Sequence, residues 1–190
     1  MTKERLEAFT DGVIAILITI MVLELRAPEG TTPAALRPLL PLFLAYVLSF
    51  AYLGIYWTNH HHMLRVVERV NGTVLWANLL LLFWLSLVPF ATWWMGENHV
   101  APWPTAVYGA VLLLAAVSYH LLQARLVALQ GPESVLARAT TRSAKERVSE
   151  FCYVAAIPLA FVSPWISDAL FVTVALIWIV PDRRIEAQIE

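Results

Sequence analysis

The sequence has 190 residues, of which 59% are hydrophobic and 14% are charged. A mean hydropathy of +0.67 and this low charge content exclude an average soluble domain, in which about 25% of the residues are charged, and predict an integral membrane protein. The net charge of −1 gives no indication of a nucleic-acid partner, and we expect none. The single cysteine, Cys152, excludes an intrachain disulfide and a cysteine-based metal site.

The first apolar stretch covers residues 9–25 and is flanked by Arg5 and Arg26. At about 1.5 Å per residue, a helix of this length extends for roughly 25 Å, close to the hydrocarbon thickness of a bilayer, which is about 30 Å. Thr19 is the one hydrogen-bonding side chain in its central part. The stretch predicts a first membrane-spanning helix at about residues 9–26.

Asp11, near the start of this helix, has two interpretations. Thr10 or Asp11 can cap the helix N-terminus, where the helix dipole favours a carboxylate. Alternatively, Asp11 belongs to a functional polar cluster, because ionisable groups at membrane depth are costly and usually face the interior of a helix bundle or a water-filled path. The spacing alone does not distinguish the two.

Three more long apolar stretches follow in chain order. The first of them carries aromatic residues at levels suited to anchoring at the membrane interface, and the next contains Pro89. These stretches predict spans at about residues 39–60, 73–95 and 104–127.

The last part of the chain is less regular. Residues 130–150 form the longest polar region and predict a helix outside the membrane. Two shorter apolar runs, broken by Ser163 and Pro164, then predict a helical hairpin with spans at about residues 148–163 and 165–181. The predicted fold class is all-α, a single domain of six transmembrane helices.

The distribution of basic residues predicts the orientation of these spans. Of the 13 Lys and Arg residues, all but Arg26 and Arg37 fall on the same side of a six-span arrangement. Lys and Arg are enriched in cytoplasmic loops, so we expect both termini to be cytoplasmic. The predicted location is the cell membrane, as in the inner membrane of a bacterium.

One narrow stripe of the first predicted helix has the geometry of a pore lining. Helical spacings of i, i+3, i+4 and i+7 relate its residues, which are Ile16, Thr19, Ile20 and Leu23. In a symmetric assembly with this stripe on the axis, the three apolar side chains would form stacked rings, and such constrictions can gate by dewetting. Alternatively, the Thr19 hydroxyl bonds to a carbonyl of its own helix one turn back.

The other polar residues give weaker indications. His60, His61 and His62 cannot all ligate one ion from a regular helix, because neighbouring side chains point about 100° apart, so no metal site is predicted. Glu24 either forms a ring of carboxylates or pairs with a nearby arginine, and Asp168 is expected to cap the last helix. No sequence motif of an enzyme is present.

The residues Arg5-Leu6-Glu7-Ala8-Phe9-Thr10-Asp11-Gly12 resemble the RxxxFSDG signature of bacterial members of the lysosomal/endosomal potassium channel (transmembrane protein 175) family. Thr10 replaces the usual serine and keeps the hydroxyl. Residues 56–61 and 86–90 extend the resemblance, which is clear over the first half of the chain and limited to layout in the second.

The resemblance implies a homotetramer whose first helices line the pore, without the carbonyl filter of ordinary potassium channels. It implies an apolar constriction at Ile16, Ile20 and Leu23 and a contribution of Thr19 to selectivity. It also implies that a histidine, His60 or His61, joins a polar cluster with Arg5 and Asp11 that holds the first helix. The signature and this cluster comprise Arg5, Phe9, Thr10, Asp11, Gly12, His60 and His61.

The favoured hypothesis is therefore a potassium-preferring cation channel that needs no cofactor. Its expected partners are three further copies of the chain, membrane lipids and permeant potassium or other monovalent cations. The alternative is a proton-coupled or small-substrate transporter with Asp11, His60 and Glu24 as a relay. The sequence shows no inverted repeat and no span broken at mid-membrane, which disfavours the transporter. A membrane enzyme that uses the histidines is the third possibility.

Overall fold

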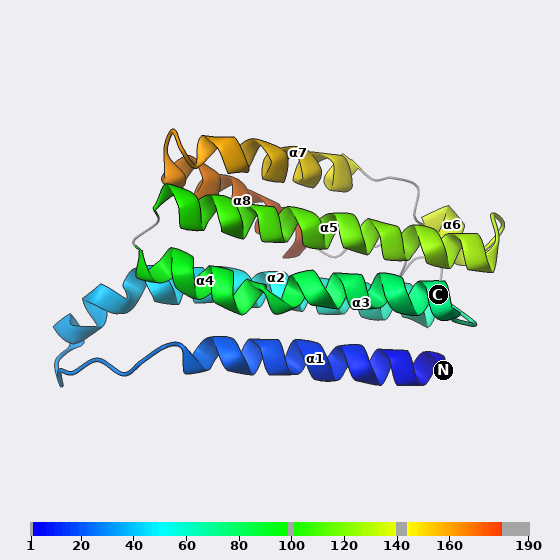
Figure 1. Cartoon of the computed structure of the whole chain (residues 1–190), viewed down its shortest axis with the longest axis horizontal. Coiled ribbons are helices and arrows are strands. Elements are labelled where there is room, and N and C mark those ends of the chain that lie inside the picture. The colour runs from blue at the N-terminus through cyan, green and yellow to red at the C-terminus, as the bar shows by residue number, and fades with distance from the viewer. Residues whose placement is uncertain (1, 99–100, 140–143, 180–190) are drawn as a thin grey trace.

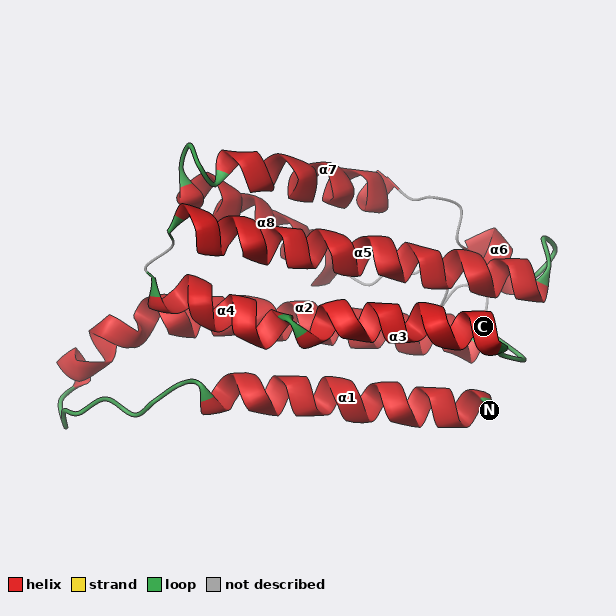
Figure 2. Cartoon of the chain, viewed as in Figure 1, coloured by secondary structure: helices red, strands yellow, loops and turns green. Residues whose placement is uncertain are grey.

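The computed structural model describes residues 2–98, 101–139 and 144–179. Almost all of these residues are helical, and none of them lies in a β-strand (Figure 2). The prediction of an all-α fold is therefore confirmed. The elements in chain order are α1 (Lys3–Leu23), the 3₁₀ helix η1 (Pro33–Leu39), α2 (Leu40–Arg65), α3 (Gly72–Ser86), α4 (Val88–Glu97), α5 (Pro102–Gln130), α6 (Val135–Ala139), α7 (Ala144–Leu159) and α8 (Pro164–Ile179).

Four segments are long and apolar enough to cross a bilayer. They are α1, η1 with α2, α3 with α4, and α5. The predicted third span is interrupted at Leu87, because Pro89 stands in the first turn of α4, where its missing N–H breaks the helical hydrogen-bond pattern. The expectation that no span is broken in its interior, which was used against the transporter, is therefore wrong for this span. Helix α8 is apolar but shorter, and α7 begins in polar sequence, so the count of six spans stays a prediction.

The predicted helix over residues 130–150 is wrong. Helix α5 ends at Gln130, and Gly131 adopts φ +96°, a left-handed conformation that glycine tolerates and that stops a helix. Of the described residues from 131 to 139, only the five residues of α6 are helical, and α7 starts at Ala144. Helix α7 then carries the chain from polar into apolar sequence and forms a hairpin with α8 (Figure 1).

The basic residues gather at one end of the bundle. The N-terminus of α1, the C-terminus of α2, the start of α3 and the C-terminus of α5 share this end, while the α1–α2 connection lies at the other (Figure 1). Hydrogen bonds join the elements there, since Gln130 Nε2 donates to the Arg69 carbonyl at 2.9 Å. Arg26 and Arg37 lie in the connection at the opposite end. This arrangement agrees with the charge asymmetry on which the predicted orientation depends.

Helix α1 lies at the edge of the subunit. It packs against α2, α3 and α4, whereas α5 packs against α3, α4, α7 and α8 (Figure 1). Elsewhere the bundle is closely packed: a Cβ atom on Gly96 of α4 would lie 2.6 Å from the Leu42 Cα atom of α2. Helix α1 contributes Leu6, Ile14, Leu17 and Met21 to the core and leaves much of its remaining surface uncovered.

The candidate pore-lining helix and its polar network

Helix α1 has one face against the subunit and one face open. Its buried side chains are Leu6, Thr10, Ile14, Leu17 and Met21, which recur at helical spacing. The predicted stripe is on the open side: the exposed fractions are 58% for Ile16, 40% for Ile20 and 78% for Leu23. Large apolar side chains that the subunit leaves uncovered must contact lipid or other subunits. The structure therefore places the stripe on a face that the subunit itself leaves to lipid or to further copies of the chain.

Thr19 lies on this open face and forms the bond that the alternative interpretation predicts. Its hydroxyl donates to the Ile16 carbonyl oxygen at 2.8 Å. This bond uses the only hydrogen of the hydroxyl, so the lone pairs of Oγ1 remain available as acceptors. The intrahelical bond and a role toward cations are thus compatible.

The signature residues of α1 differ in their burial. Thr10 is completely buried, whereas Arg5, Asp11 and Gly12 are exposed, and Phe9 is 50% exposed. No atom outside its own helix turn lies within 4 Å of a Cβ atom built on Gly12. Thr10 is therefore the only one of these five residues that is buried within one subunit.

Thr10 belongs to a buried hydrogen-bond chain that ties three helices together. Asn78 of α3 donates through Nδ2 to Thr10 Oγ1 at 2.9 Å. The Asn78 Oδ1 atom lies 2.9 Å from His60 Nε2 of α2. Because an amide oxygen only accepts, His60 Nε2 carries the hydrogen of this bond. All three residues are buried, so the chain fixes α1 against α2 and α3.

Asn78 was not predicted. It is 68 residues from Thr10 in sequence, and nothing in its local pattern names its partners. The available signal was a single amide in the apolar run of α3, since a polar side chain in a membrane-spanning helix usually bonds across helices. Of the two candidate histidines, His60 joins this chain, while His61 is exposed and stacks on Trp57 with ring centroids 6.1 Å apart.

Arg5 and Asp11, which the resemblance places in one polar cluster, do not pair with each other in the single subunit. The two residues are six positions apart on one helix, which turns their side chains about 240° from each other. Both are exposed, and Asp11 instead accepts a hydrogen bond from Trp57 Nε1 at 2.9 Å. The expected neighbour from the second span is present, but the charge partner and the burial are not.

Of the two other acids that the sequence singled out, Glu24 lies beside the stripe residue Ile20 and Asp168 lies on α8. Glu24 is half-buried and lines a hollow of about 280 Å³ between α1 and α4. The prediction that Asp168 caps the last helix is wrong, because α8 begins at Pro164, four residues earlier. The Asp168 Oδ1 atom is buried and has no hydrogen-bond partner among the described residues.

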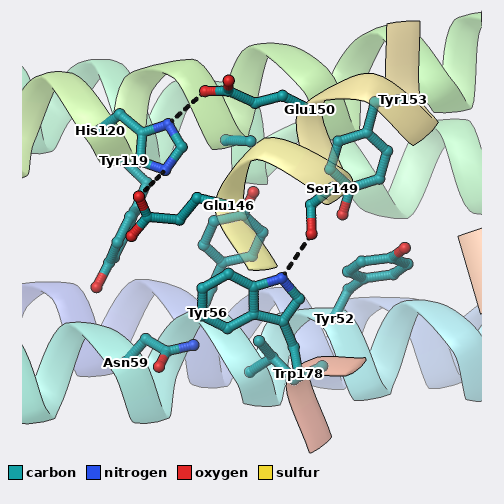
Figure 3. A pocket seen from close by; sticks show the side chains of 12 residues that line it. Tyr52, Tyr56, Asn59, Tyr119, His120, Glu146, Ser149, Glu150, Tyr153 and Trp178 are labelled. Carbon is teal, nitrogen blue, oxygen red and sulfur yellow. Dashed lines mark hydrogen bonds and ion pairs between the residues drawn. The ribbon is translucent and has the colours of Figure 1, made fainter. Parts of the chain in front are cut away.

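A second polar cluster, which the sequence did not predict, joins α5, α7 and α8. His120 of α5 lies with Nδ1 2.8 Å from Glu150 Oε1 and with Nε2 3.9 Å from Glu146 Oε2. Trp178 Nε1 of α8 donates to Ser149 Oγ at 2.8 Å. Figure 3 shows these side chains around a small cavity that is also lined by four tyrosines, Tyr52, Tyr56, Tyr119 and Tyr153. The cluster fastens the C-terminal hairpin to the rest of the bundle.

A metal site is not found in the part of the chain that the structure describes, where no three His, Cys, Asp or Glu side chains are grouped suitably. The arrangement offers neither a nucleophile with its base nor a ligand set. Its distinctive feature is helix α1, which packs against the subunit on one side and leaves an apolar stripe exposed on the other.

Comparisons with known proteins give the same picture. A family model described as endosomal/lysosomal potassium channel TMEM175 matches residues 5–89, which include α1, α2 and α3. A potassium channel of Chryseobacterium sp. (strain P1-3) is 52% identical over 190 residues, which cover 100% of this chain and 99% of that protein. The endosomal/lysosomal proton channel TMEM175 of Mus musculus is 36% identical over 103 residues, 48% of this chain and 21% of that protein.

The fold also matches a solved member of the family. The crystal structure of a lysosomal potassium-selective channel TMEM175 homolog from Chamaesiphon minutus superposes with a TM-score of 0.82 and 29% identity. The match covers 94% of this chain and 96% of that chain. The chain therefore belongs to the TMEM175 family and is a multi-pass membrane ion channel, not an enzyme.

Proposed function

We propose that the protein is a potassium-preferring cation channel in which four α1 helices line the pore. The observation that carries this proposal is the open stripe on α1, an apolar surface that its own subunit holds in place from behind and does not cover. The printed names of the relatives support a channel for potassium. One helix cannot enclose an ion path, and closed rotational symmetry is the usual way in which copies of a chain do so.

In this arrangement Ile16, Ile20 and Leu23 form three apolar constrictions. An isoleucine ring offers an ion no ligands, so passage requires either a widening that admits water or a dehydration cost on the order of several kcal/mol. The rings therefore limit conductance and supply a gate. Thr19 places the one ring of oxygen atoms between Ile16 and Ile20 and contributes to the choice between potassium and sodium.

We place six spans in the cell membrane, a bacterial inner membrane, with both termini in the cytoplasm. The grouping of the basic helix ends supports this orientation. The permeant ion is the only small partner that the pore requires. The polar chain of Thr10, Asn78 and His60 has a structural role here, because it fixes α1 from the side away from the stripe.

The test is ion flux through the purified protein in planar bilayers. With potassium on one side and sodium on the other, we expect single-channel current steps and a reversal potential displaced toward that of potassium. A pH gradient at equal potassium concentrations should leave the reversal potential near zero. A reversal potential that follows the pH gradient instead would replace the potassium proposal by proton conduction, and transport without current steps would favour the transporter.

A further inference from the structure

Asp168 is an unusual charged group, because it lies on the apolar helix α8 and one of its carboxylate oxygens has no hydrogen-bond partner among the described residues. Its Oδ1 atom is buried and unbonded among the described residues. An uncompensated carboxylate away from water is costly, and such groups usually mark a binding or transport function. The negative charge of the Asp168 carboxylate therefore requires a compensating group.

Asp168 lines an apolar groove between α2 and α8. The groove has a volume of about 620 Å³, in the range of ligand sites, and Asp168 is the only charged residue among the described residues that line it. The α2 wall runs from Leu40 to Ala51, which at 1.5 Å per residue is about 17 Å, close to half of the 30 Å hydrocarbon core. The groove is thus long enough for the acyl chain of one membrane leaflet.

The mouth of the groove lies at the membrane interface. Both walls start at the same end of the bundle, where Trp165 is 72% exposed and Leu40 is 50% exposed (Figure 1). Tryptophan is enriched at this level, where its ring meets the lipid head groups. Asp168 is one turn below Trp165 on α8, so its carboxylate lies near the position of a head group.

The groove faces lipid if α1 lies on the axis, as proposed above. Helix α1 packs against α2, α3 and α4, while α8 packs against α2, α5 and α7 (Figure 1). Helix α8 is therefore on the far side of the subunit from α1. The next copy of the chain approaches α1, and the membrane reaches the groove.

We propose that this groove binds phosphatidylethanolamine, with one acyl chain along the apolar walls and the ammonium group on Asp168. A primary ammonium provides three N–H donors and a positive charge, which a lone carboxylate requires. Phosphatidylcholine has the same charge but no N–H donor. An anionic lipid brings its phosphate toward the carboxylate, and the lining contains no Lys or Arg to offset the repulsion.

The experiment compares lipids that differ only in the head group. The full-length protein is delipidated in detergent, titrated with phosphatidylethanolamine or phosphatidylcholine of identical chains, and the bound lipids are counted by native mass spectrometry. We expect about tenfold tighter binding of phosphatidylethanolamine, the factor that one charge-assisted hydrogen bond supplies. Phosphatidylglycerol should bind less tightly than either.

Three variants locate the site. Asp168→Asn should abolish the preference for phosphatidylethanolamine without weakening the binding of phosphatidylcholine. Ala169→Trp fills the groove from an exposed position and should reduce the binding of both lipids. Glu97→Gln removes an exposed carboxylate at the same end of the bundle outside the groove and should change nothing.

Equal binding of the two lipids by the wild type, or an unchanged preference in Asp168→Asn, would overturn the proposal. Full lipid binding by Ala169→Trp would do the same, because it would show that another chain or surface occupies the groove. Melting temperatures of the variants identify any that fail to fold. The lipid counts do not depend on conduction, so they remain informative if the proposed potassium preference fails.

Discussion

At the scale of single residues, the structure assigns the anchoring of α1 to Asn78. Replacement of Asn78 by Ala leaves Thr10 Oγ1 and His60 Nε2 buried without the bonds that they share with the amide. We expect the free energy of unfolding to fall by about 1–3 kcal/mol, the penalty for unsatisfied buried polar groups. Thermal or denaturant unfolding of the purified channel measures it. Asn98→Ala, at an exposed residue after α4, is the matched control and should change stability little.

Thr19 permits an equally local test of ion selection. Thr19→Val keeps the shape of the side chain and removes the oxygen, so potassium preference over sodium should weaken while the assembly stays intact. Reversal potentials under mixed potassium and sodium conditions report the change. Thr173→Val in α8 is the control, because Thr173 is exposed and makes the same kind of bond, to the Ala169 carbonyl oxygen at 2.7 Å. Unaltered selectivity in Thr19→Val would remove Thr19 from the ion path.

At this scale, the sequence predicts relations between residues close together in the chain better than contacts between residues far apart in it. Helical spacing relates Ile16, Thr19 and Leu23 to one another, but the choice of their face as the pore lining came from the family resemblance. The absence of an Arg5–Asp11 pair within one subunit was predictable in principle, since six residues turn a helix by about 240°. The Thr10–Asn78 bond was not, because it depends on the packing of α3 against α1, which no local pattern encodes.

At the scale of the element, the two faces of α1 should respond oppositely to the same substitution. Ile16→Asn places an amide on the open face, where it should ease hydration of the constriction and raise single-channel current. Leu17 is only 6% exposed, so Leu17→Asn removes core packing and buries an amide. It should cost about 2–5 kcal/mol of stability and reduce the yield of folded protein.

Current recordings and unfolding measurements on both variants separate the two faces. If Leu17→Asn raises the current and Ile16→Asn leaves it unchanged, the pore face is rotated from the one described here. Two element boundaries were missed although their causes are local. Pro89 interrupts the continuous span predicted at about residues 73–95, and the left-handed backbone of Gly131 breaks the helix predicted over residues 130–150.

At the scale of the whole molecule, the sequence predicted an all-α membrane protein. The assembly has to be inferred from the surfaces that one subunit leaves exposed. Composition indicated a membrane protein, and the basic residues indicated which helix ends lie together, because both depend on sums over many residues. The packing of the C-terminal hairpin on α5 depends on contacts such as that of His120 with Glu150, which join residues far apart in sequence. The assembly is likewise encoded in side chains that one subunit leaves exposed.

The assembly itself leads to the last prediction. In mild detergent the wild type should have four times the 21.3 kDa mass of one chain. No atom lies within 4 Å of a Cβ position built on Gly12, so the phenylalanine of Gly12→Phe fits the isolated subunit. In a tetramer, the four phenylalanine rings would collide near an axis lined by α1. We therefore expect this variant to lose tetramer while α1 stays folded. Gly72→Phe, at an equally open position at the start of α3, should remain tetrameric. A wild type that is only monomeric, or a Gly12→Phe tetramer as stable as the wild type, would contradict the placement of α1 on the axis.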